Sequence, residues 1–153
     1  MSEPRPWVPH ALSYLVGITL LLLAVQYILG IWTSAYAPAQ FTTTPSTAAY
    51  TSHIVAGYIV GLAALVLFVV SVLSKDPRVM AQSLAVLVTI GLAGVFGRLF
   101  VSTTPNDPAY SFAMGLLFLV AFGACMGLLW SVWRSPAERP MGSPSNPPAG
   151  PAA

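Results

Sequence analysis

The stretch HIVAGYIVGLAALVLFVVSVLS, residues 53–74, decides the fold of this chain, because it is a long apolar run without one charged residue. About 20 apolar residues are enough for a helix to cross the hydrocarbon core of a bilayer. Three further long apolar runs lie at 11–33, 79–101 and 109–133, and Arg98 is their only charged residue. In lipid, backbone polar groups must be hydrogen-bonded within their own segment, so each run predicts a transmembrane helix. We therefore expect an all-α, up-down-up-down four-helix membrane bundle.

The composition supports a bilayer as the natural environment of the chain. Of its 153 residues, 56% are hydrophobic and only 7% are charged, and its mean hydropathy is +0.77. A soluble domain carries about a quarter charged residues and could not cover its surface with so few. The net charge of +2, without a basic patch, argues against a nucleic-acid partner. The single cysteine, Cys125, excludes an internal disulfide.

The basic residues predict how the bundle is oriented in the plasma membrane. Five of the six precede the first span, connect the second to the third, or follow the fourth, and they are Arg5, Lys75, Arg78, Arg134 and Arg139. The two other connections contain only Asp107 as a charged residue. The positive-inside rule then places both termini in the cytoplasm. Residues 1–10 form a short cytoplasmic segment, and residues 134–153, rich in proline, are expected to be disordered.

His53 is the leading functional candidate, because a polar side chain inside a membrane segment is costly to bury. It is expected in the first turn of the second helix, near the outer surface. Its imidazole could bind a metal or haem iron or relay a proton, and the alternative is an interfacial side chain that faces water. Gly57 and Gly61 follow on the same helical face. This bare face leaves room for a flat porphyrin or lets another helix pack closely, as Gly123 and Gly127 would on the fourth helix.

Arg98, Met114 and Gln26 are the other polar or polarisable candidates in the spans. Arg98 is the only charged residue inside them and lies near the outer end of the third helix, where it could bind a haem propionate or snorkel to the surface. Met114 lies near the outer end of the fourth helix, and its thioether could ligate haem iron opposite His53, although methionine more often fills space. Gln26 is expected to hydrogen-bond across helices.

Two segments resemble the haem A synthase family of cytochrome oxidase biogenesis. They are LLLLAVQYILGIWTSAYAP (20–38) and YTSHIVAGYIVGLAALVL (50–67). Gln26, Leu29 and Gly30 match a stretch that ends one helix of that family, and His53 matches its haem-ligating histidine. The resemblance implies a haem cofactor bound at His53 and a role in respiratory electron transfer or oxidase biogenesis. It also implies four-helix halves with cytoplasmic N-termini.

The chain departs from that family at the positions that carry its chemistry. Ala49 stands where the catalytic half has a glutamate, and Ile54 stands where an arginine is often found. Ser52-His53 and Ser111-Phe112 open two spans alike, which suggests a duplicated hairpin, and Phe112 then replaces the second histidine. We therefore do not expect the family's hydroxylation reaction. His53 would hold haem alone, with Met114, or with a ligand from a partner.

Two other functions are compatible with the residue pattern. The chain could be a cofactor-free accessory subunit that packs against a larger respiratory membrane complex, because its glycine faces favour close helix contacts. A transporter is less favoured, because the spans contain no Asp, Glu or Lys that could carry a proton or bind an ion.

Overall fold

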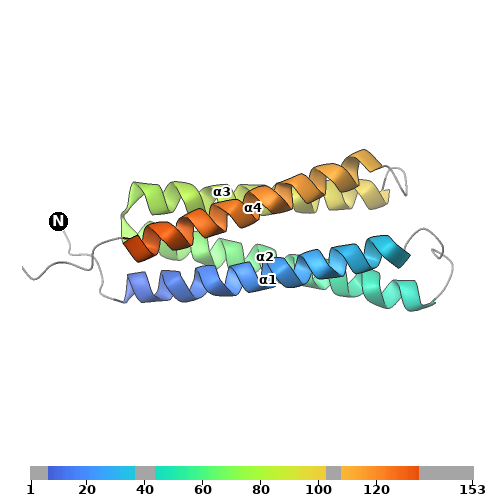
Figure 1. The fold of residues 1–153 in the computed structure, drawn as a ribbon, viewed down its shortest axis with the longest axis horizontal. Helices are drawn as coiled ribbons and strands as arrows, with labels where there is room; N and C mark the ends of the chain where they lie inside the picture. Colours follow the sequence, from blue (N-terminus) through green and yellow to red (C-terminus); the bar gives the residue numbers. More distant parts are fainter. Residues whose placement is uncertain (1–6, 37–43, 103–107, 135–153) are drawn as a thin grey trace, which may run out of the picture.

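The computed structural model describes residues 7–36, 44–102 and 108–134. They form four helices, α1 (Val8–Tyr36), α2 (Thr44–Ser74), α3 (Pro77–Ser102) and α4 (Pro108–Arg134). The helices run alternately in opposite directions (Figure 1), and the described residues contain no strand. The predicted all-α four-helix bundle is confirmed. Each helix holds a stretch long and apolar enough to span a bilayer, so the chain is a multi-pass membrane protein. Asp107 lies outside the described residues, and so does the predicted disordered tail after Arg134.

The second helix begins earlier than hydropathy predicts. It starts at Thr44 rather than near residue 53, so His53 lies in its third turn and not in its first. The apolar part that can span the membrane, Tyr50–Ser74, still agrees with the predicted run. Hydropathy cannot detect a polar helical extension outside the bilayer. Pro45 does not oppose this extension, because proline is tolerated in the first turn of a helix.

A tight turn joins α2 to α3. Lys75 has a φ of 57°, the left-handed conformation in which many helices end. Asp76 then accepts a hydrogen bond at its Oδ1 from the N–H of Arg78 at 2.8 Å, which caps α3. Pro77 occupies the first helical position, which suits its fixed φ. We call the end of the bundle that holds this turn the turn end, and the opposite end, where α1 leads to α2, the pocket end.

The buried side chains gather in the half of the bundle nearer the turn end. Those of the apolar core are Val8, Leu12, Val16, Leu23, Val60, Ala64, Leu67, Val79, Val86, Ile90, Ala121, Cys125, Leu128 and Val132. The hydroxyls of Ser71 and Ser83 hydrogen-bond across α2 and α3 there at 2.5 Å. No described side chain is buried in the pocket-end segments 27–33, 48–59, 94–100 and 109–120. The pocket half of the bundle therefore has no core of its own.

The bundle consists of two closely packed hairpins. Helix α1 packs mainly on α2, and α3 mainly on α4, whereas the contacts between the two hairpins are less extensive. Figure 1 shows the hairpins diverging from the turn end toward the pocket end. Large apolar side chains are exposed on all four helices, which is the surface that lipid tails require and water does not favour. Divergence of the hairpins opens the interior at the pocket end.

Candidate functional site

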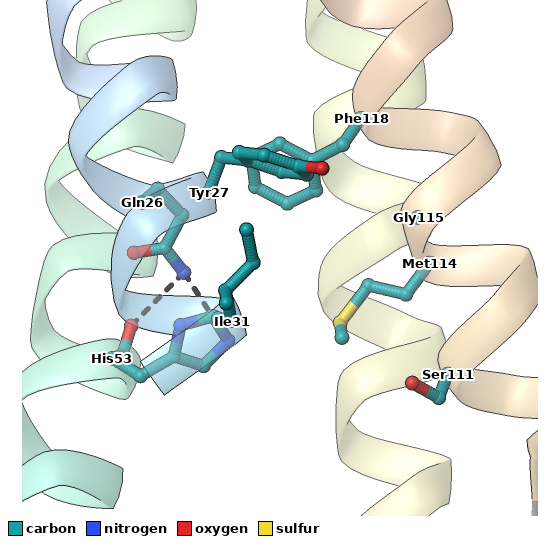
Figure 2. A pocket seen from close by; sticks show the side chains of 9 residues that line it. Gln26, Tyr27, Ile31, His53, Ser111, Met114, Gly115 and Phe118 are labelled. Carbon is teal, nitrogen blue, oxygen red and sulfur yellow. Dashed lines mark hydrogen bonds between the residues drawn. The ribbon is translucent and has the colours of Figure 1, made fainter. Parts of the chain in front are cut away.

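A pocket of about 430 Å³ lies between the two hairpins at the pocket end. Its walls come from α1, α2 and α4, and the lining residues are Gln26, Tyr27, Gly30, Ile31, His53, Ser111, Met114, Gly115 and Phe118 (Figure 2). The volume falls within the range of about 300–1,000 Å³ that is typical of small-molecule and cofactor sites. The walls are mostly apolar, with Gln26 and His53 as polar groups on one side and Ser111 on the other. This is the usual constitution of a ligand site.

His53 is held in place by two reciprocal contacts between α1 and α2. The amide nitrogen of Gln26, a residue only 4% exposed, donates a hydrogen bond to the backbone carbonyl of His53 at 3.0 Å. A Cβ at Gly57 would lie 3.3 Å from that nitrogen. In the opposite direction, a Cβ at Gly30 would lie 3.3 Å from Cε1 of His53. Each glycine thus makes room for a polar side chain of the neighbouring helix.

Both ring nitrogens of His53 lie against residues of α1. Its Nδ1 is buried without a hydrogen-bond partner, and Nδ1 and Cε1 are the ring atoms that face Gly30. Nε2 lies 3.5 Å from the amide nitrogen of Gln26. Buried polar atoms without a partner are few in native structures and call for an explanation. The unpaired Nδ1 belongs to a residue that lines the pocket, although the atom itself lies against Gly30.

Met114 faces His53 from the other hairpin. Figure 2 shows the two side chains on opposite sides of the pocket. A Cβ at Gly97 of α3 would lie 3.4 Å from the sulfur of Met114, so this side chain is also backed by a glycine of its hairpin partner. Imidazole and thioether are both axial ligands of haem iron. Each hairpin therefore contributes one possible iron ligand to the same pocket.

Not all of the predicted site residues meet there. His53 and Met114 line the pocket, whereas Gly57 packs against Gln26 and does not line it. A Cβ at Gly61 would meet nothing within 4 Å. Arg98 is exposed on α3 and does not line the pocket.

The face of α4 that points into the pocket is not the face that the internal repeat suggests. Phe112, which aligns with His53 in that repeat, is 69% exposed. Ser111, Met114, Gly115 and Phe118 face the pocket instead. These positions follow the spacing of one helical face, so the pattern was present in the sequence. Only the packing of α4 against the other helices selects this face.

The donor set suits haem better than a bare metal ion. Among the described residues, no three His, Cys, Asp or Glu side chains gather into a group that could hold a metal ion. A protein site for zinc, for example, requires three or four such ligands. Haem brings four equatorial nitrogens of its own, so one or two axial donors are enough. His53 and Met114 provide that number.

Comparisons with protein-family models, with curated proteins and with solved structures gave no match. The resemblance to haem A synthase therefore rests on the residues of α1 and α2 quoted above.

Proposed function

We propose that this chain is a membrane haem-binding protein that serves respiratory electron transfer or cytochrome oxidase biogenesis. His53 of one hairpin and Met114 of the other are the residues that would hold the haem. Bound haem would supply a one-electron redox centre. Lys75, Arg78 and Arg134 all belong to the turn end. The positive-inside rule then directs the pocket end to the outer side of the plasma membrane.

The observation that carries the proposal is that no described side chain is buried in the segments 27–33, 48–59, 94–100 and 109–120, while two haem-ligand types line the pocket. Protein interiors are normally packed as densely as organic crystals. Side chains around an unfilled space lose dispersion contacts. A large flat ring between the hairpins would restore these contacts.

The remaining lining residues determine how such a ring is held. Tyr27, Ile31 and Phe118 provide apolar and aromatic walls, which exclude water and favour a porphyrin face. Gly30 on α1 and Gly115 on α4 also line the pocket, and neither fills it with a side chain. Ligation by one histidine and one methionine raises the reduction potential of haem iron. The chain therefore suits the acceptance of electrons at a relatively high potential.

Titration of the detergent-purified protein with haemin, followed by optical absorption, tests the proposal. The wild type should develop a saturable Soret band at one haem per chain. His53→Ala should lose it. His10→Ala is the matched control, because His10 is the only other histidine and lies at the turn end, and it should bind like the wild type. A wild type without a Soret band, or equal binding by His53→Ala, would refute the proposal.

An accessory-subunit role is the second candidate, and the surface of α4 favours it. Gly123 is exposed, and a Cβ there would meet nothing within 4 Å. Such a position allows a helix of another protein to approach closely. Gly123→Leu should then abolish co-purification of a larger subunit, whereas Gly17→Leu, at an equally open position on α1, should not. Failure to isolate a stoichiometric partner from native membranes would contradict this role.

A further inference from the structure

The amide of Gln26 has only one acceptable orientation. Its nitrogen lies 3.0 Å from the backbone carbonyl oxygen of His53. A carbonyl oxygen only accepts hydrogen bonds, so the amide must present its NH₂ group there and not its own oxygen. Gly57 makes this approach possible, because a Cβ at this position would lie 3.3 Å from the amide nitrogen. Gln26 is almost completely buried, so it has no water to turn toward.

The same NH₂ group also faces the imidazole. Nε2 of His53 lies 3.5 Å from it, at the long limit of a hydrogen bond. Because the NH₂ group can only donate, it attracts a lone pair on Nε2 and repels an N–H there. Nδ1 lacks a partner in either neutral form of the ring. The contact at Nε2 therefore decides between the two forms.

We propose that Gln26 is a positioning residue that selects the tautomer of His53, with the proton on Nδ1 and the lone pair on Nε2. This role deepens the proposed haem site and rests on it, because the lone pair of Nε2 is the group that iron needs. The hydrogen bond from Gln26 to the backbone carbonyl of His53 does not involve the ring, so it would remain with haem bound. Only the weak contact at 3.5 Å would be given up, so Gln26 would compete only weakly with a metal for Nε2.

Nitrogen NMR of the ligand-free protein in micelles, labelled at histidine, measures the tautomer directly. The chain has two histidines, and the exposed His10 serves as the internal reference. In the wild type, His53 should carry its proton on Nδ1. Gln26→Met keeps the length of the side chain and removes both donors, so it should raise the population with the proton on Nε2. Gln82→Met is the matched control: Gln82 also packs over a glycine, at 3.6 Å from a Cβ at Gly127, but it does not line the pocket.

Haemin titration of the same variants supplies the second readout. Loss of a residue that orients a metal ligand typically lowers metal affinity about 10-fold to 100-fold, and we expect this for Gln26→Met but not for Gln82→Met. A wild-type spectrum with the proton on Nε2 overturns the role of Gln26 without any variant. An unchanged tautomer in Gln26→Met overturns it as well, even if a Soret band forms. Absence of haem binding together with the expected tautomer would overturn only the proposed function.

Discussion

Substitution of Gly30 by alanine should separate two effects of this glycine: its low helix propensity and the space that it leaves for the imidazole of His53. Alanine gains about 0.5–1 kcal/mol over glycine inside a helix, because glycine loses more backbone entropy on folding. Gly17→Ala on the same helix should show this gain alone, because its Cβ would meet nothing within 4 Å. At Gly30 the Cβ would lie 3.3 Å from Cε1 of His53. Carbon atoms attract one another best at about 3.5–4.0 Å, so the ring must move by a few tenths of an ångström.

The expected changes in stability and in haem affinity follow from the contact between this Cβ and the His53 ring. Forcing an extra methyl group into a packed contact costs about 1–3 kcal/mol. We therefore expect Gly30→Ala to be less stable than Gly17→Ala by about 1–3 kcal/mol, although both gain helix propensity. Displacement of the imidazole should also weaken haem binding about tenfold, which corresponds to about 1.4 kcal/mol. Gly17→Ala should bind haem like the wild type.

Unfolding in mixed micelles, followed by helical circular dichroism, measures the first difference, and haemin titration measures the second. The pair of variants shares the helix, the chemical change and the membrane environment, so their difference reports the contact with His53. Equal stabilities and equal affinities for Gly30→Ala and Gly17→Ala would show that the ring is not held against α1. Such a result would refute the close approach of the His53 ring to Gly30.

Three other changes test separate parts of the structure. Met114→Leu keeps an apolar side chain but removes the thioether. The haem-bound variant should still form a Soret band, but at a shifted position. A spectrum identical to that of the wild type would exclude ligation by Met114. Arg98→Gln should leave haem affinity within about twofold, because Arg98 does not line the pocket; a larger loss would show that it reaches a propionate. Ser71→Ala and Ser83→Ala remove one hydrogen bond from its two sides, and a double-mutant cycle of unfolding free energies should give a coupling of about 0.6 kcal/mol, with zero coupling contradicting the bond.

The residues of α1 show how much of the site could be predicted. Gln26 was expected to bond across helices because an amide inside a membrane must find a partner. The structure identifies this partner as the backbone of His53. Nothing in the sequence showed that Gly30 would back the imidazole, because a glycine in an apolar helix can serve many contacts. The same holds for Gly97 behind Met114.

The start of α2 and the exposure of Phe112 show where sequence patterns fail. Hydropathy ends a predicted helix where polarity begins, whereas α2 continues through polar residues to Thr44. The internal repeat aligned Phe112 with His53, but Phe112 is turned outward and Met114 faces the pocket. Apolar helices resemble one another by composition alone. Such an alignment therefore cannot establish which face points inward.

By itself, the sequence determined that the chain crosses a bilayer four times and that His53 and Met114 lie toward the same end. Both conclusions follow because apolar length sets the number of spans and because each helical residue adds about 1.5 Å of height. Rotation of each helix about its own axis was decided only by the tertiary structure. It turned His53 and Met114 into one pocket and left Arg98 outside it. Height is a local property of the chain, whereas rotation depends on how four apolar surfaces pack together.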